Sequence, residues 1–350
     1  MKTGAGVAAG LLGLTSTSTS AVAQNDKRTS HKFLFWNTWL LDGIEFINVA
    51  GKPQYEKRAE EIGKALAEND YDIVALAEVF DSAERETIKQ NLKANTDGKV
   101  SDRVGPKADG FEMSGGLYSL LVGNRSYVSS NSFEYAAEGN TWCDADAWAG
   151  KGVQHTEVDV GPGNIDVFST HLFAGGGLPI CWGGGGDRTE IRRSQIQELI
   201  SFVEMNSKPE NVTIVSGDFN IEDAPNEEYG FIQEMKDELG LYDAWERFGD
   251  GKGATNDAAF GGGCTVDENG EPPYYCQGNA EGEGERIDYV FVEKPKSGHT
   301  IELDVADMKR ASFWRGKADP SKYADDNEEI PNYLSDHMAL ELEFDAVPKS

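Results

Sequence analysis

The sequence predicts an α+β domain in which two mixed β-sheets pack as a sandwich between helices, giving a four-layered α/β/β/α fold. Apolar runs of strand length alternate with helical patterns along the chain. The strands are too many and too mixed for a simple doubly wound sheet, which favours the two-sheet sandwich. No internal repeat and no long low-complexity linker is visible, so one domain at 32–346 is favoured over two.

The individual elements are predicted from two kinds of apolar spacing. Short apolar runs, some alternating as half-buried strands do, predict strands at 32–37, 72–78, 117–123, 152–160, 164–171, 211–218, 286–292 and 338–344. Apolar residues that repeat every three or four positions predict helices at 54–69, 82–92, 188–205 and 226–239. Glycine-rich loops at 174–187 and 249–285 interrupt this pattern, and such long loops in a compact domain often bind ligands.

The composition indicates a folded body with an acidic surface. The 350 residues are 39% hydrophobic, and the formal net charge is −29, from 61 acidic against 32 basic residues. Acidic residues occur in nearly every stretch between apolar runs, which argues against a separate acidic tail. Such a surface resembles that of halophilic proteins, and at ordinary ionic strength it repels nucleic acid.

The first 23 residues have the pattern of a signal peptide. One lysine, a short Gly/Ala/Leu run and a Ser/Thr stretch lead to Ala-Val-Ala at 21–23, which is a small-residue cleavage signature. The apolar run is too short to span a bilayer. We therefore expect a secreted protein in which 24–31 is a polar linker.

Four cysteines follow the expected cleavage site, and they are Cys143, Cys181, Cys264 and Cys276. An even number in an exported protein predicts two disulfide bonds, although sequence alone permits three pairings. We favour Cys143 with Cys181 and Cys264 with Cys276. Zinc binding is disfavoured because the sequence has no CxxC pair and no histidine between the last two cysteines.

Several predicted strands begin or end in a polar side chain that can perform chemistry. These residues are Asn37, Glu78, His171, Asp218, Asn220, Asp288, Asp336 and His337. Each one alone is ordinary, because polar residues after strands usually make turns or face solvent. Together they can converge on one edge of a sandwich, which is how a scaffold assembles a site from distant sequence.

The residue types in this set point to one kind of chemistry. Carboxylates and carboxamides without a cysteine ligand suit Mg²⁺, Mn²⁺ or Ca²⁺ rather than Zn²⁺. Two histidines with acidic neighbours can supply a general base and a donor to a developing negative charge. This combination serves phosphoester hydrolysis, and no GxSxG, P-loop or dinucleotide motif competes with it.

Seven short motifs in order resemble the endonuclease/exonuclease/phosphatase superfamily, which includes deoxyribonuclease I. They are NTWLL, DIVALAEVFD, GG at 115–116, STH, GDFN, RIDYVF and SDH, and they span roughly 32–345. Within this superfamily the sequence most resembles the secreted bacterial neutral sphingomyelinases. EVFD at 78–81 is similar to their segment after the metal-binding glutamate, and Cys143 and Cys181 fall where those enzymes carry a disulfide bond.

The resemblance implies a metal site made of five residues. Glu78, with Asn37 nearby, matches the main ligand of a divalent metal, and Asp336 matches an acidic neighbour at the metal edge. Asp218 and Asn220 match the pair that handles the nucleophilic water, the phosphate and a second metal ion. The cofactor expected from the resemblance is Mg²⁺, with Mn²⁺ or Ca²⁺ as alternatives.

The resemblance also implies three catalytic roles. His171 matches the donor to the transition state, His337 the general base, and Asp288 the carboxylate that orients the histidine. The alternation of the last strand aims Asp336 and His337 to opposite sides, so the test is whether Asp288 lies within hydrogen-bond reach of His337. The residues expected to contact substrate or a membrane surface, with the last two exposed, are Phe80, Phe313 and Trp314.

The sequence thus favours a secreted, monomeric, Mg²⁺-dependent phosphodiesterase of the sphingomyelinase C type that acts on a phospholipid. One alternative is a nuclease of the same fold acting on extracellular DNA or RNA, but the sequence shows little cationic clustering beyond Arg188, Arg192 and Arg193. Another is a non-catalytic lipid-binding module. Of the other histidines, His155 is expected to be structural, and the remaining two, His31 and His299, are expected at the surface.

Overall fold

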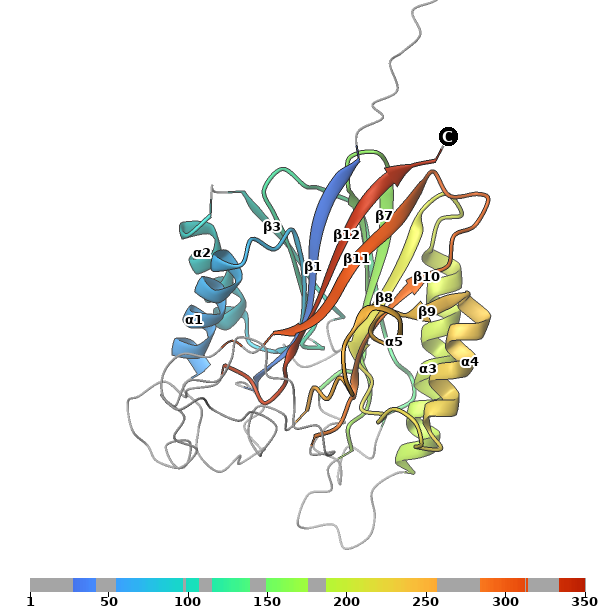
Figure 1. Ribbon diagram of the computed structural model, residues 1–350. Coiled ribbons are helices and arrows are strands. Elements are labelled where there is room, and N and C mark those ends of the chain that lie inside the picture. Colours follow the sequence, from blue (N-terminus) through green and yellow to red (C-terminus); the bar gives the residue numbers. More distant parts are fainter. Residues whose placement is uncertain are drawn as a thin grey trace, which may run out of the picture.

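Two six-stranded sheets lie face to face in the computed structural model (Figure 1). The structure describes residues 28–41, 55–96, 99–106, 115–138, 149–175, 187–256, 284–311, 313 and 334–349. The predicted signal peptide, the four cysteines and Trp314 lie outside these residues. Within them, no helix is long and apolar enough to cross a membrane.

The first sheet has the strand order β11-β12-β1-β2-β4-β3. Its strands are β1 Thr29–Leu40, β2 Ile73–Val79, β3 Val100–Val104, β4 Tyr118–Val122, β11 Ile301–Ala311 and β12 Ala339–Pro348. The helices that cover its outer face are α1 Tyr55–Glu68 and α2 Ser82–Ala94 (Figure 1). Asp81 begins α2 as an N-cap, because its side chain accepts the free backbone N–H of Ala83.

The second sheet has the strand order β5-β6-β7-β8-β10-β9. Its strands are β5 Tyr127–Glu134, β6 Gly152–Asp159, β7 Asn164–His171, β8 Val212–Asp218, β9 Leu241–Asp243 and β10 Asp288–Glu293. The helices α3 Arg188–Asn206 and α4 Tyr229–Leu239 pack on its outer face, and the short α5 Ala244–Phe248 follows β9 (Figure 1).

Three apolar layers hold the sandwich together. The layer between the sheets includes Phe33 and Phe35 of β1 and Ile214 of β8. A second layer lies under α1 and α2, and a third lies under α3 and α4. The predicted four-layered α/β/β/α sandwich is therefore confirmed, and burying apolar faces on both sides of each sheet explains the long apolar runs of its central strands.

Each sheet contains one parallel pair of strands, β1 with β2 and β7 with β8, within otherwise antiparallel pairing. The carboxyl ends of parallel strands lie at the same edge of a sheet. Asn37 and Glu78 therefore sit near one edge of the first sheet, and His171 and Asp218 are direct neighbours at an edge of the second. Asp288 begins the antiparallel β10 directly opposite Asp218.

The structure contains strands that the sequence did not predict, namely β3, β5, β9 and β11. β5 and β11 are edge strands, and most of their side chains are not buried, so their sequences lack the apolar runs that mark central strands. β1 also begins earlier than expected, because Thr29, Ser30 and His31 pair with the end of β12. These residues, assigned to the linker 24–31, belong to the sheet.

The expectation that His31 and His299 lie at the surface is wrong, because both are buried. The ring of His31 stacks on Phe344, with 5.4 Å between ring centroids, and Arg125 Nε donates to its Nδ1 at 3.2 Å. His155 is structural as expected, since its Nε2 bonds Asp166 Oδ1 at 2.8 Å and its ring stacks on Phe168. A histidine's exposure thus depends on its neighbours rather than on its residue type.

Acidification below the ordinary pKa of histidine is expected to destabilise the protein through His31. Burial, and then the Arg125 guanidinium, lower the pKa of His31 from 6.5. The unfolded chain then binds the proton more readily, so this contribution to stability is complete above pH 6.5 and falls as the pH drops toward the folded-state pKa. Urea unfolding at several pH values gives the free energy of unfolding. We expect this free energy to fall less steeply with decreasing pH in His31→Gln than in the wild type, by up to about 1.4 kcal/mol per pH unit. Equal slopes would contradict the prediction.

Candidate active site

Four side chains from the ends of β1, β2, β7 and β8 meet where the two sheets come together. Asn37 Nδ2 donates to Asp218 Oδ2 at 2.9 Å, which joins the two sheets directly. His171 Nε2 lies 3.5 Å from Asp218 Oδ2 and 3.7 Å from Glu78 Oε1. The structure therefore brings together residues far apart in the sequence, as predicted from the polar strand ends.

His337 lies beside this group and is held by Asp288. The distance between His337 Nδ1 and Asp288 Oδ2 is 2.7 Å, so Asp288 lies within hydrogen-bond reach of His337, as the sequence predicts. His337 Nε2 lies 3.9 Å from Asp218 Oδ2. Burial lowers the pKa of His337, but the charge and hydrogen bond of Asp288 outweigh it and raise this pKa well above its usual value. Asp288 Oδ1 is buried and has no hydrogen-bond partner among the described residues.

The turn before β12 is fastened to the end of β1. Ser335 Oγ donates to the carbonyl oxygen of Asn37 at 2.6 Å and accepts the backbone N–H of His337 at 3.0 Å. Trp36 Nε1 donates to the carbonyl oxygen of His337 at 3.0 Å. Burial is the largest cause of the raised pKa of Glu78, and the charge of Asp336 adds to it. The place of Asp336 at the metal edge stays a prediction.

Glu78 and Asn220 have positive φ angles, 58° and 51°, which are uncommon for residues other than glycine. Asn220 completes a tight turn, because its backbone N–H donates to Asp218 Oδ1 at 2.9 Å and its Nδ2 donates to the carbonyl oxygen of Leu172 at 2.9 Å. This turn fixes the orientation of the Asp218 carboxylate. Backbone strain of this kind is frequent at functional sites.

The carboxylates of this site, of which Asp218 is buried and Glu78 is half-buried, favour a bound cation. Burial is the main cause that raises the pKa of Glu78 to about 7 and that of Asp218 to about 7. Ligand atoms of Glu78, His171 and Asp218 lie within 4.8 Å of one another. Two carboxylates that resist ionisation in a buried site are stabilised by a divalent ion, and their oxygens suit Mg²⁺. The residues present therefore fit the metal that the sequence predicts.

Glu78 and Asp218 are the residues that would hold such an ion through oxygen, and Asp336 stays a predicted ligand from the family resemblance. The amide of Asn37 already donates to Asp218, and its Oδ1 accepts the N–H of Trp39 at 3.1 Å. The side-chain Oδ1 of Asn37 retains a second lone pair. Asn37 can therefore both orient Asp218 and add an oxygen ligand to the ion.

Lys151 is part of the site, although the sequence analysis missed it. It immediately precedes β6, it is 5% exposed, and its Nζ lies 2.7 Å from His171 Nε2 and 3.1 Å from His171 Nδ1. Burial, followed by the charges of Lys151 and His337, keeps the pKa of His171 well below its usual value. A lysine directly before a buried strand was the available signal.

Two expected contact residues are buried instead. Phe313 is 7% exposed and packs on Trp36 with 4.7 Å between ring centroids, so the expectation that it forms an exposed membrane contact is wrong. Phe80 is 3% exposed and packs with Ala149. Its ring also lies against Gly116, where an added Cβ would approach Phe80 to 2.7 Å, which explains the glycine there. Phe80 is therefore packed in the interior, and its contact with substrate stays a prediction.

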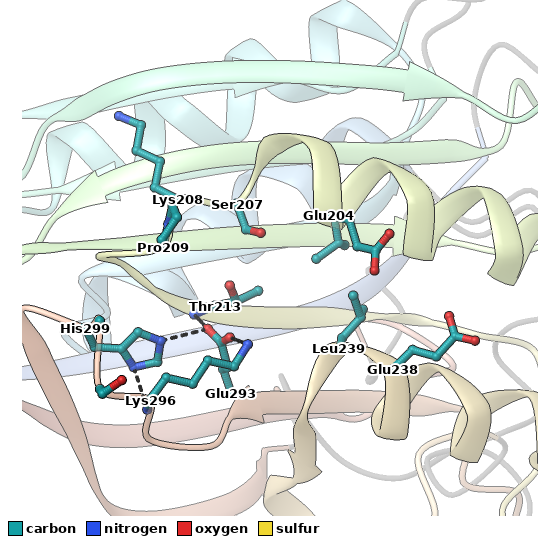
Figure 2. Close-up of a pocket in the computed structure, with 13 residues that line it drawn as sticks. Glu204, Ser207, Lys208, Pro209, Thr213, Glu238, Leu239, Glu293, Lys296 and His299 are labelled. Atoms are coloured by element: carbon teal, nitrogen blue, oxygen red, sulfur yellow. Dashed lines mark hydrogen bonds and ion pairs between the residues drawn. The ribbon is translucent and has the colours of Figure 1, made fainter.

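A pocket of about 520 Å³ lies at the other end of the second sheet, where β8 begins and β10 ends (Figure 2). His299 Nε2 lies 3.4 Å from Glu293 Oε2, and this carboxylate also accepts the backbone N–H of Thr213 at 3.0 Å. None of the predicted catalytic residues lines this pocket. It is therefore separate from the site at the ends of β1, β2, β7 and β8.

The chain is similar to bacterial phospholipases. Phospholipase C of Staphylococcus aureus is 23% identical over 333 residues, 93% of this chain and 91% of that protein. Sphingomyelinase C of Bacillus cereus is 25% identical over 225 residues, 62% of this chain and 64% of that protein. No family model matches the chain.

Solved structures share the fold. S. aureus beta toxin superposes with a TM-score of 0.59 at 19% identity, covering 89% of this chain and 99% of that chain, and another of its structures contains bound magnesium ions. D. rerio TDP2 with a single-strand DNA product has a TM-score of 0.57 at 16% identity, covering 90% and 98%. An endonuclease/exonuclease/phosphatase family protein from Leptotrichia buccalis has a TM-score of 0.51 at 18% identity, covering 90% and 99%. This chain therefore has the endonuclease/exonuclease/phosphatase fold and is similar in sequence to phospholipase C and sphingomyelinase C of bacteria.

Proposed function

We propose that this protein is a secreted, metal-dependent phosphodiesterase of the sphingomyelinase C type, which hydrolyses the headgroup ester of a phospholipid. The observation that carries the proposal is the buried His337 and Asp288 pair, with His337 Nε2 3.9 Å from Asp218 Oδ2. A base, its orienting carboxylate and a group of buried acidic residues at one edge are what metal-assisted phosphodiester hydrolysis needs.

The roles of the residues follow from which atoms are engaged. Because His337 Nδ1 is bonded to Asp288, Nε2 is the ring nitrogen that can take a proton from the attacking water when the imidazole is neutral. A divalent ion held by the neighbouring carboxylates would favour that neutral form, because it would oppose the charges that raise the pKa of His337. The water oxygen bonds to phosphorus as the bond between phosphorus and the lipid oxygen breaks, and this oxygen takes a proton from water to leave as the lipid alcohol. Mg²⁺ at this site would supply polarisation of the phosphoryl oxygens. Lys151 and His171 lie together and can donate to the negative charge that develops on those oxygens.

Headgroup release from lipid vesicles tests the proposal. Vesicles of sphingomyelin and of phosphatidylcholine should release phosphocholine with Mg²⁺ present and not in EDTA. Assays should cover low and high salt, because the charge of −29 is screened in concentrated salt. If wild-type protein releases no headgroup from either lipid under any of these conditions, the proposal fails.

The nuclease alternative is tested in parallel with a plasmid-nicking assay. Of the three arginines that could hold a nucleic acid backbone, Arg192 is buried, with its Nη2 2.6 Å from Glu228 Oε2, whereas Arg188 and Arg193 are exposed. The formal net charge of −29 supports the lipid substrate over DNA or RNA at ordinary ionic strength. Plasmid nicking without headgroup release would favour the nuclease alternative. If both assays are negative, the lipid-binding module is the alternative that is left.

Replacing Lys151 by methionine is expected to lower turnover by about a hundredfold, because it removes a buried donor beside His171 that is proposed to stabilise the phosphoryl oxygens. The matched control is Lys236→Met, since Lys236 is also buried but pairs with Glu246 on the outer side of the second sheet. Steady-state kinetics on both variants check the prediction. Equal turnover in the two variants would contradict it.

A further inference from the structure

Arg58 lies in α1 and is completely buried, although it is a charged residue. Its guanidinium donates to three backbone carbonyl groups: Nη2 to Thr38 at 2.7 Å, Nη1 to Trp39 at 2.9 Å and Nε to Leu334 at 3.1 Å. Burying a cation is costly unless its donors are satisfied, so these bonds account for its place in the interior.

The three carbonyl groups belong to the two segments that carry Asn37, Asp336 and His337. Thr38 and Trp39 directly follow Asn37, which donates to Asp218. Leu334 precedes Ser335, Asp336 and His337. The guanidinium therefore bridges the end of β1 to the turn before β12, next to the direct bond from Ser335 Oγ to the carbonyl oxygen of Asn37.

The end of β1 needs such a restraint. Trp39 has a φ angle of 52°, which is unfavourable for an aromatic residue, and its ring lies 5.3 Å from the Arg58 guanidinium. A planar guanidinium presents its N–H donors in fixed directions, so one side chain can hold three carbonyl groups in a set geometry. A lysine ammonium lacks this fixed arrangement.

We propose that Arg58 is a positioning residue, which sets the distance between Asn37 and the Asp336–His337 pair by bridging their backbones. This inference rests on the proposed phosphodiesterase function and adds a residue on a helix outside the first sheet to its machinery. Because Asp336 is expected at the metal and His337 at the water, a displacement of their turn should impair both turnover and metal binding.

The test compares Arg58→Met with Leu66→Ala, a variant of another buried α1 residue that makes none of these carbonyl contacts. We expect turnover of Arg58→Met to fall by at least about tenfold with little change in KM, since a displacement of about 1 Å can cost up to about a hundredfold. Calorimetric titration with Mn²⁺ should show weaker binding in Arg58→Met by about tenfold. Leu66→Ala should lose thermal stability while keeping the turnover and Mn²⁺ affinity of the wild type.

Ser335→Ala provides a second variant, because it removes the bond from Ser335 Oγ to Asn37 and the bond from the His337 N–H to Ser335 Oγ without leaving a buried charge unsatisfied. If Arg58→Met does not fold, Ser335→Ala must lower turnover by about tenfold at constant KM, as a shift of the same turn requires. If Arg58→Met has the same turnover and Mn²⁺ affinity as Leu66→Ala, the positioning role of Arg58 is wrong, and activity of the wild type still supports the proposed function. If the wild type has no activity, the proposed function is wrong. In that case an unchanged Mn²⁺ affinity in Arg58→Met would show that the positioning role is wrong as well.

Discussion

Replacing His337 by alanine is expected to lower turnover by at least about a hundredfold, because the attacking water then has no base held at hydrogen-bond distance. His337 is fixed from three sides: Asp288 bonds its ring, Ser335 bonds its N–H, and Trp36 bonds its carbonyl group. A water molecule entering the vacated space cannot reproduce this orientation. Steady-state kinetics on lipid vesicles, with Mg²⁺ saturating, measure the effect.

The matched control for this substitution is His299→Gln. His299 is also buried and also lies beside a carboxylate, Glu293, but at the far end of the second sheet. We expect its turnover to stay within about twofold of the wild type, as for substitutions away from a functional site. If turnover falls by a comparable factor in both variants, the loss in His337→Ala comes from removing a buried histidine and not from removing the base. The assignment of His337 as the base would then be wrong.

Replacing Glu78 by glutamine is expected to have a loss of similar size, accompanied by loss of metal binding. The substitution preserves shape but removes the negative charge that a divalent ion requires. A metal contribution of about 3–4 kcal/mol to the transition state corresponds to about a hundred- to a thousandfold in rate. Excess Mg²⁺ should restore part of the turnover if the remaining carboxylates still hold the ion weakly, and calorimetry measures the affinity directly.

Glu341→Gln is the control for Glu78→Gln. Glu341 is buried on the outer side of the first sheet, where Tyr71 donates to it and Lys32 Nζ lies 3.2 Å away. Its substitution should lower the free energy of unfolding and leave Mg²⁺ affinity unchanged. A fully active Glu78→Gln with wild-type affinity would exclude Glu78 as a ligand.

The sequence was sufficient for the sandwich and for much of the site because both depend on strands. The central strands are apolar on both faces, so their limits are visible, and a polar residue at such a limit lies at a sheet edge. This is how Glu78, His171 and Asp218 could be identified. The partnership of His337 with Asp288 was expected from the family resemblance, and the structure confirms their contact.

Other features depend on contacts that a linear pattern does not contain. Lys151 is one lysine among 32 basic residues, and only the pairing of Gly152 with His171 brings it into the site. Phe313 has the residue type of a membrane contact, but Trp36 and Tyr71 enclose it. Edge strands such as β11 escaped prediction because solvent, rather than apolar packing, covers many of their side chains.

The Asn37–Asp218 bond spans the gap between the sheets, so the separation of the two layers also sets the width of the site. That separation is fixed deeper inside by residues such as Phe35 and Ile214, which belong to the apolar layer between the sheets rather than to the site. Oxygen atoms lie about 2.0–2.1 Å from Mg²⁺ but about 2.3–2.6 Å from Ca²⁺. We therefore expect the relative affinity of the site for Mg²⁺ and Ca²⁺ to depend on the apolar layer between the sheets. A smaller or larger side chain in this layer should change which ion binds more tightly, although every ligand stays in place.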